Sequence, residues 1–379
     1  MTRISILRRM TWASLLVLAL SAGVLAQDNL QKLPVAEFSR LVQEFSEADG
    51  FFRSDNFTSN ETSYLHVVDK LRELGVSGGA YIGVGPEQNF TYIAKIRPRI
   101  AFIVDIRRQA VIQHLLYKAI FHTSESRAEF LSGLLSRPLG EAGVAGKGSS
   151  IERLVQHFNS VPASEPVFAA NLSKVRKIIQ EEFQFPLSDQ DQQRLEYVYA
   201  TFHKEGLGIM YRAGPTNWSG GSSFPSLGDL IVQPDLKGVL GNFLATDEDY
   251  QFVRNLQLNN RIIPVVGDFA GPKAFASVGE YLRKNDYVVS AFYTSNVEQY
   301  LFQNEVFAAF AANVRKLPIN ADSVFIRAVA SRGQVHPANV AGHRLTTLLQ
   351  KIAVFLKDHD AGAYTDYRSL VTTNFIVGQ

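Results

Sequence analysis

The sequence predicts an α/β protein built on a mostly parallel, doubly wound sheet. Three observations predict this class. Short apolar runs alternate with helical patterns, the first run ends in a glycine turn, and a long helical segment interrupts the alternation. The chain has 379 residues, of which 46% are hydrophobic and 20% are charged. This length and composition allow one large core or two smaller ones.

The first 26 residues are typical of a secretory signal peptide. Arg8 and Arg9 precede an apolar stretch at 12–20, and residues 24–26 provide the small side chains that a signal peptidase accepts before Gln27. An uncleaved anchor is the alternative, because the apolar character continues to residue 26. No second apolar run of spanning length follows, so we expect an exported protein without a stable membrane span after cleavage.

The charge balance gives no reason to expect nucleic acid or an anionic membrane as the main partner. The chain has 38 basic and 36 acidic residues, and removing the three arginines of the signal peptide leaves 35 basic against 36 acidic residues. There is no cysteine, which excludes disulfides, thiolate metal sites and a catalytic thiol. One glycosylation sequon lies in the motif described below, which favours a bacterial periplasmic or secreted protein over a eukaryotic one. The sequons begin at Asn56, Asn60, Asn89, Asn171 and Asn217.

Residues 27–123 are predicted to form two N-terminal helices and the first half of the α/β domain. Gly75 ends the second helix, and a short apolar strand then ends in a tight turn at Gly83. The predicted helices are 35–47, 62–74, 89–96 and 107–121, and the predicted strands are 80–82 and 100–104.

Residues 124–260 are predicted to be a large helical insertion between strands two and three. Its helices are expected at 125–135, 151–158, 172–183 and 188–204, with Ser188 and Asp191 as cap and first-turn acid of the last one. A stretch rich in Gly, Ser and Pro at 214–228 predicts a loop, either a binding loop or a disordered one.

Residues 261–379 are predicted to form the second half of the α/β domain. Its expected strands are 261–266, 287–292 and 323–329, and its expected helices are 271–283, 297–315 and 341–356.

The most informative motif is the turn after the first strand, Gly83-Val84-Gly85, together with an acid after the second strand. Glycines at a strand-to-helix turn let backbone amides approach a ligand at the helix N-terminus. Asp105 follows Gly85 by 20 residues, the offset at which a carboxylate accepts the ribose hydroxyls of a nucleoside. The pattern predicts a nucleoside-like small-molecule ligand, and a glycine turn followed by a helix-capping Asp is the structural alternative.

These residues resemble the class I S-adenosylmethionine-dependent methyltransferases, which have a Rossmann-like fold. The motifs GVGPEQNFTY (83–92) and SNVEQYL (295–301) are also similar to a poorly characterised bacterial family with this fold. The resemblance covers about residues 60–123 and 261–357 and implies S-adenosylmethionine as the cofactor. The cofactor-binding positions it implies are Gly83, Gly85, Glu87, Gln88, Asn89, Asp105, Ile106, Arg107, Gly267, Asp268 and Phe269. The implied catalytic positions, which line the methyl-transfer site after the fourth strand, are Tyr293, Ser295 and Asn296.

The first motif departs from the usual methyltransferase pattern at three positions. Tyr81 stands where those enzymes carry an acid, Glu87 replaces a third glycine, and Pro86 removes an amide donor. Glu87 is therefore a candidate partner for the ligand's ammonium group. A nicotinamide cofactor fits less well, because its fingerprint requires glycine at the position of Gln88.

Other chemistries have weaker signals. The chain has no Gly-x-Ser-x-Gly motif for a hydrolase nucleophile, and Pro337 interrupts the helix that would align His336 with His343 for a metal. No metal site is expected. The segment 51–61 mixes aromatic residues with Asp, Asn, Ser and Glu, and we interpret it as a loop that folds over the mouth of the cofactor site, with ordinary surface packing as the alternative.

The sequence therefore predicts an S-adenosylmethionine-binding protein that transfers a methyl group to a small molecule or an envelope component. Export conflicts with this prediction, because S-adenosylmethionine is a cytoplasmic metabolite. The conflict is resolved if the leader is a retained anchor facing the cytoplasm, if another nucleoside-like ligand is used, or if the chain is a non-enzymatic binding or interaction module.

Overall fold

The computed structural model describes residues 31–140, 148–212, 224–330 and 335–378. The predicted signal peptide lies outside these residues. So do residues 214–223 of the predicted Gly/Ser-rich loop. Within the described residues, no helix is both long and apolar enough to span a membrane.

One six-stranded sheet forms the centre of the protein, with the strand order β3-β2-β1-β4-β5-β6. Strands β1 to β5 are parallel, and β6 runs antiparallel to β5. The predicted α/β class with a mostly parallel sheet is confirmed. The strands are β1 (Ala80–Gly83), β2 (Ile100–Asp105), β3 (Ile262–Val266), β4 (Val289–Ser295), β5 (Val324–Ala330) and β6 (Leu345–Lys351).

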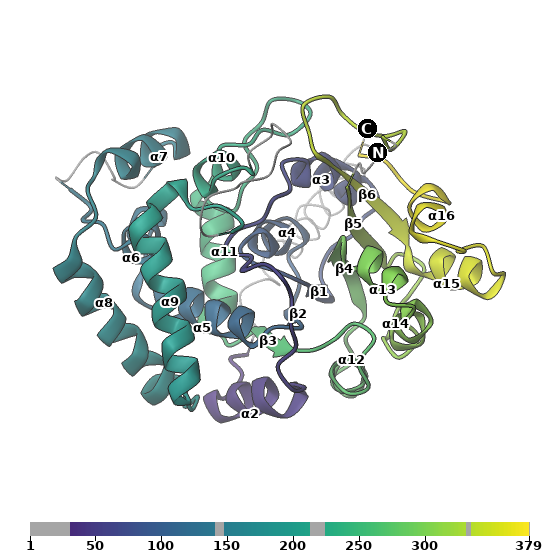
Figure 1. Ribbon diagram of the computed structural model, residues 1–379, viewed down its shortest axis with the longest axis horizontal. Coiled ribbons are helices and arrows are strands. Elements are labelled where there is room, and N and C mark those ends of the chain that lie inside the picture. The colour runs from purple at the N-terminus through teal and green to yellow at the C-terminus, as the bar shows by residue number, and fades with distance from the viewer. Residues whose placement is uncertain (1–30, 141–147, 213–223, 331–334, 379) are drawn as a thin grey trace, which may run out of the picture.

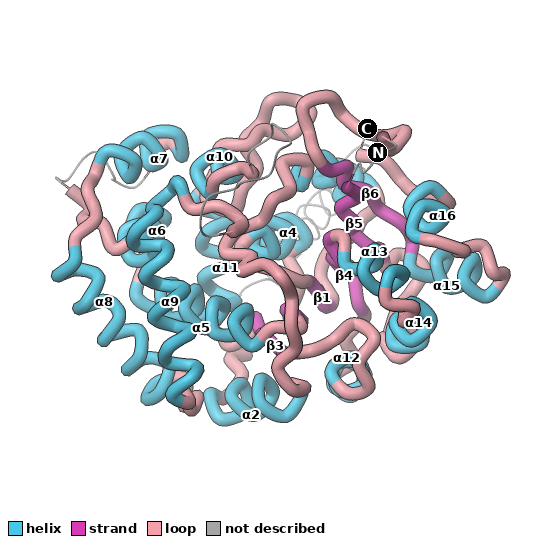
Figure 2. Tube along the Cα trace, in the orientation of Figure 1, coloured by secondary structure: helices cyan, strands magenta, loops and turns pink. Residues whose placement is uncertain are grey.

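Helices cover both faces of this sheet (Figure 1, Figure 2). Helix α5 is buried along nearly its whole length, which explains why its apolar residues are not confined to one face. The helices of the α/β frame are α2 (Val35–Phe45), α3 (Val68–Glu73), α4 (Gln88–Ile96), α5 (Arg108–Thr123), α12 (Ala274–Lys284), α13 (Val297–Gln303), α14 (Phe307–Val314), α15 (Ile352–Asp360) and α16 (Tyr367–Thr372).

Between α5 and β3 the chain forms a group of helices that lies to one side of the sheet (Figure 1). Ser188 and Asp191 form the expected capping interaction at the start of α9. The end of the predicted loop is helical instead, because Ser226 caps α10 together with Asp229. These helices are α6 (Arg127–Leu135), α7 (Ile151–Ser160), α8 (Glu165–Lys177), α9 (Asp189–Glu205), α10 (Leu227–Ile231) and α11 (Asp247–Leu258), with η2 (Ile178–Glu182) and η3 (Gly206–Gly208) between them.

The prediction of a helix at 341–356 is wrong for its first half. Residues 345–351 form β6, and the helix α15 begins at Ile352. The leucine spacing fits a helix, but β5 needs a partner for its free edge, and β6 supplies that partner through seven paired residues. Burial of almost every residue of β6 thus overrides the helical pattern.

Two other predicted helices are broken. The predicted helix 297–315 is divided into α13 and α14, because Glu305 takes a left-handed conformation with φ 59°. The rings of Phe302 and Phe307 stack across this break at 3.9 Å. The predicted helix 62–74 starts as the 3-10 turn η1 (Tyr64–Val67) and only then becomes α3.

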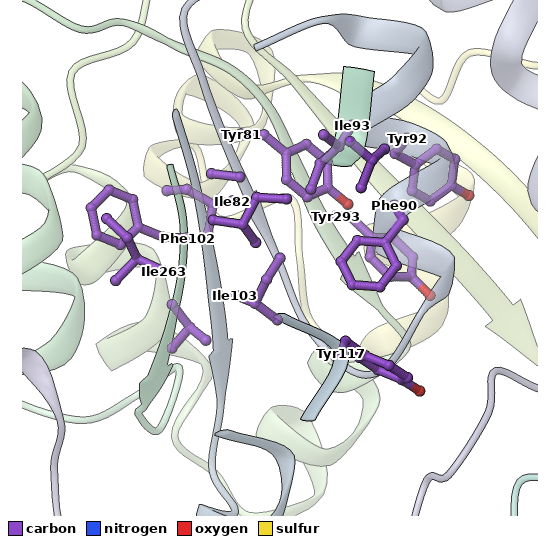
Figure 3. Close-up of a cluster of buried hydrophobic side chains, with 14 of the residues drawn as sticks. Tyr81, Ile82, Phe90, Tyr92, Ile93, Phe102, Ile103, Tyr117, Ile263 and Tyr293 are labelled. Atoms are coloured by element: carbon purple, nitrogen blue, oxygen red, sulfur yellow. The ribbon is translucent and has the colours of Figure 1, made fainter. Parts of the chain in front are cut away.

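Aromatic side chains pack beneath the carboxyl edge of the sheet (Figure 3). The ring of Phe90 on α4 meets that of Tyr117 on α5 edge-on at 5.4 Å, and Tyr92 lies 5.0 Å from Tyr293 of β4. All four side chains are buried. Packing between these large rings stabilises this part of the core.

Candidate functional site

A pocket opens where β1, β2, β3 and β4 end, at the carboxyl edge of the sheet. The space between its walls is about 1050 Å³, open solvent at the mouth included. The predicted positions that line the pocket are Gly85, Asp105, Ile106, Arg107, Gly267, Asp268, Phe269, Tyr293, Ser295 and Asn296. The structure thus brings together residues from all four strand ends, where ligands of open α/β sheets bind.

The other predicted positions lie behind the pocket wall. Asn89 donates from its amide to the carbonyl oxygens of Val84, Gly85 and Pro86 at 2.8–3.1 Å, and accepts from the hydroxyl of Tyr81 at 2.9 Å. These bonds fix the glycine turn from below. Tyr81, which stands where class I methyltransferases carry an acid, therefore supports the turn.

Gly83 is required by this arrangement. A Cβ atom at this position would lie 1.9 Å from Oδ1 of Asn89 and 2.7 Å from the ring of Tyr81. Gly85 is required for a different reason, because its φ is +81° and the space beside its Cα is open. The carbonyl of Gly85 also contacts Nε2 of His114 at 2.9 Å, and burial lowers the pKa of this histidine to about 4.

The carboxylate of Asp105 is paired with Arg107. It accepts from the backbone N–H and Nε of Arg107 at 3.0 Å and from Nη2 at 2.8 Å, and both side chains are buried. Nη1 of Arg107 donates to the carbonyl oxygens of Ser54 and Asp55. Arg107 therefore connects the segment 51–61 to the end of β2. Because the Asp105 carboxylate already accepts three hydrogen bonds, it retains about one free lone-pair site for a ribose hydroxyl.

The end of β3 is held by an acid that the sequence analysis did not identify. The carboxylate of Glu47 accepts from the backbone N–H groups of Asp268, Lys273 and Ala274 at 2.8–2.9 Å. Gly267 is packed so closely that a Cβ atom would lie 2.5 Å from that of Ala274. The side chain of Asp268 is partly exposed at the pocket, and its Oδ1 accepts from Ala270 N–H.

The end of β4 carries the hydroxyl groups of Tyr293 and Ser295, and both donate to Oε1 of Glu61, at 2.7 and 2.5 Å. Ser295 is in the left-handed region with φ 52°, an unfavourable conformation for a serine that cooperating contacts must hold in place. Asn296 follows as the residue immediately before α13 and also lines the pocket.

Glu61 is the central polar residue that the sequence analysis did not select. It is 1% exposed, lines the pocket, and also accepts from Nε2 of Gln88 at 3.0 Å. Burial raises the pKa of Glu61 above its ordinary value, against the opposing effect of these hydrogen bonds. The only sequence signal for it was its position in the segment 51–61.

That segment forms one wall of the pocket, as the interpretation of it as a covering loop predicts. It follows α2 and crosses in front of the strand ends (Figure 1). Phe51 is 85% exposed at the mouth, and the ring of Phe52 meets that of Tyr300 at 5.3 Å. The residues of the segment that line the pocket are Phe51, Phe52, Asn56, Thr58, Ser59, Asn60 and Glu61.

Glu87 faces away from this pocket. Its Oε1 accepts from the backbone N–H of Ser59 at 3.2 Å, and the side chain lines a separate small cavity beside α5 and α6. Burial raises the pKa of Glu87 to about 7. The structure therefore gives this residue a role in fastening the segment 51–61, and its carboxyl is not placed to meet a ligand ammonium group.

Two polar atoms of the pocket wall lack hydrogen-bond partners within the described residues. They are Oδ1 of Asn56 and Oγ1 of Thr58, and both are buried atoms of pocket-lining residues. Leaving such groups without a partner costs about 1–3 kcal/mol each, so a ligand with hydrogen-bond donors would be stabilised here. No group of three or more His, Asp and Glu residues suited to a metal occurs in the described part of the chain.

The fold and the pocket define an α/β protein with a candidate ligand site at the carboxyl edge of its sheet. The chain belongs to the family described as Domain of unknown function (DUF7790), whose model matches residues 56–141 and 151–375. None of the curated proteins compared with the chain matches it.

Proposed function

We propose that the pocket binds S-adenosylmethionine and that the protein transfers its methyl group to a small-molecule or envelope acceptor. The observation that carries this proposal is the convergence of four strand ends on one pocket: the glycine turn after β1, Asp105, Asp268, and Tyr293 to Asn296. In this proposal the sheet is a Rossmann-like frame, and helices α6 to α11 are an insertion between its second and third strands.

The residues present fit this cofactor in three respects. The space beside Gly85 is open, so a ligand can approach the backbone there. Asn56 and Thr58 offer unpartnered oxygen atoms to donor groups. Acids outnumber bases among the described lining residues, which suits a cofactor with a positive sulfonium centre.

The chain's own part in the reaction is binding, orientation and proton transfer. S-adenosylmethionine, when bound, supplies an electrophilic methyl group. Asn296 and the hydroxyls of Tyr293 and Ser295 would orient an acceptor at the end of β4, where holding two reactants in line contributes most to the rate. Glu61 lies within hydrogen-bond distance of both hydroxyls and is the nearest group able to take up a proton from the acceptor.

The pairing of Asp105 with Arg107 favours a second candidate, a binding module without turnover. A carboxylate that already accepts three N–H groups is a weak site for two ribose hydroxyls. In this alternative the pocket takes another nucleoside-like ligand, and an exported protein needs no supply of S-adenosylmethionine.

Calorimetry with S-adenosylmethionine and Thr58→Val tests the proposal. The substitution keeps the side-chain shape and removes a buried hydroxyl that has no partner among the described residues, so we expect equal or higher stability but roughly 2- to 10-fold weaker binding. Thr346→Val is the matched control, because Oγ1 of Thr346 is also buried without a partner among the described residues but lies on β6, outside the pocket lining. Absence of binding to the unmutated protein would reject the proposal.

A further inference from the structure

Glu61 is a buried carboxyl on the pocket wall whose hydrogen-bond partners are all neutral. Its two oxygen atoms accept from Tyr293, Ser295 and Gln88, and within the described residues it forms no ion pair. A buried carboxylate without a counter-ion is costly. Without a positive charge beside it, Glu61 therefore favours its protonated form, in agreement with the raised pKa of this group.

The rest of the pocket wall does not provide the missing positive charge. Arg107 is the only basic residue among the described residues that line the pocket. Its guanidinium is occupied by Asp105 and by the carbonyl oxygens of Ser54 and Asp55. Arg53 does not line the pocket, and its guanidinium lies 5.9 Å from the ring centre of Tyr300. A positive charge next to Glu61 must come from the ligand.

We propose that Glu61 selects the ligand by charge, acting as the counter-ion of the sulfonium centre and so distinguishing S-adenosylmethionine from its thioether product, S-adenosylhomocysteine. This inference rests on the proposed function. The two molecules differ by one methyl group and one positive charge, while their nucleoside and amino-acid parts are the same. Binding of the cation displaces the proton of Glu61 into the solvent, so atoms and charge balance without another reactant.

The expected size of the preference follows from linkage. An opposite charge within about 4–6 Å changes the proton affinity of a carboxylate by about 10-fold or more, and the carboxylate strengthens cation binding by the same factor. Displacing the proton of Glu61 uses part of this factor at pH 7. The unmutated protein should therefore bind S-adenosylmethionine several-fold, up to about 10-fold, more tightly than S-adenosylhomocysteine, and release of the product would follow from loss of its charge.

The experiment is calorimetric titration with both molecules at pH 7, in two buffers of different ionisation enthalpy. We expect proton release with S-adenosylmethionine and none with S-adenosylhomocysteine. Glu61→Gln keeps the side-chain shape and should lose both the preference and the proton release. Glu248→Gln is the control, because its carboxyl is exposed, pairs with Arg97 and does not line the pocket, and it should retain both the preference and the proton release.

A pH series provides a second measurement that does not need the Glu61 variant to fold. The titratable groups that interact with Glu61 are Tyr81, Glu87, Tyr92, Tyr293 and Tyr367. The tyrosines have raised pKa values and stay neutral between pH 5 and 8, so only Glu87 competes in this range. In a Glu87→Gln background, affinity for S-adenosylmethionine should fall with decreasing pH while affinity for S-adenosylhomocysteine stays constant.

The outcomes separate the two proposals. If the unmutated protein binds neither molecule, the proposed function fails and the charge selection fails with it. If it binds both equally, or if Glu61→Gln retains the preference, the charge selection is overturned and the proposed function stands.

Discussion

Substitution of Asp105 by alanine should destabilise the protein strongly, even though the residue lies at a pocket. The variant leaves the guanidinium of Arg107 buried with only two carbonyl oxygens, because Asp105 accepts from its Nε and Nη2. It also removes the acceptor of the Arg107 backbone N–H. Only 8% of the Arg107 side chain and 5% of the Asp105 side chain are exposed. Removing one partner of such a buried pair costs about 3–5 kcal/mol, a large part of the stability of a typical domain.

Urea denaturation followed by circular dichroism measures this loss. Glu248→Ala is the control, because Glu248 pairs with Arg97 at 2.9 Å but is 83% exposed, so its removal should cost less than about 1 kcal/mol. The double variant Asp105→Ala with Arg107→Leu should be less destabilised than the sum of the single variants, since neither charge is then left alone. A free energy of unfolding for Asp105→Ala within about 1 kcal/mol of the unmutated value would refute this reasoning.

Three further predictions follow from particular residues. Asn296→Ala should lower turnover of labelled S-adenosylmethionine on envelope extracts far more than it lowers cofactor affinity, and transfer of no label by a protein that binds the cofactor would favour the binding module. Glu87→Gln should become more stable relative to the unmutated protein, by up to ~3 kcal/mol, as the pH rises from 5 to 8. The raised pKa of about 7 means that Glu87 stabilises the fold at low pH and loses this effect as it ionises. If the free energies of unfolding of the variant and of the unmutated protein changed in parallel with pH, this prediction would be contradicted. N-terminal sequencing of protein recovered outside the cytoplasm should find Gln27 first, and an intact Met1 would argue against cleavage.

The sequence was sufficient to predict the ends of β1, β2 and β3, because each of these strands is a short apolar run that stops at or just before a glycine or an acid. Parallel strands share one carboxyl edge, so Asp105, Asp268 and Asn296 could be expected together before their distances were known. The sequence was not sufficient for β6, whose leucines at 345, 348 and 349 have helical spacing. That strand forms because it pairs with the free edge of β5, and the spacing of apolar residues within one segment cannot predict a pairing with another segment.

Glu61 could not be identified from the sequence for a similar reason. Its position depends on the path of the segment 51–61 across the strand ends, and this path is fixed by contacts that are distant in the chain. Arg107 holds the carbonyls of Ser54 and Asp55, Gln113 donates to the carbonyl of Phe57 at 2.8 Å, and Glu87 accepts from Ser59. No local pattern signals these contacts, and an acid between polar residues is usually solvent-exposed.

The same contacts couple ligand binding to the position of this segment. Asp105 cannot fully accept a ribose and also neutralise Arg107, because the carboxylate has about four lone-pair sites and three are in use. If a ligand forms its hydrogen bonds with the Asp105 carboxylate, Arg107 loses its counter-ion. The hydrogen bonds from Arg107 to the carbonyl oxygens of Ser54 and Asp55 then weaken as well. If Asp105 stays paired, the ligand must be held by the segment itself, through Asn56, Thr58 and Glu61. The structure keeps both the Asp105–Arg107 pair and the hydrogen bonds from Arg107 to Ser54 and Asp55. These contacts favour the second arrangement, in which ligand recognition depends on the segment 51–61 that covers the pocket.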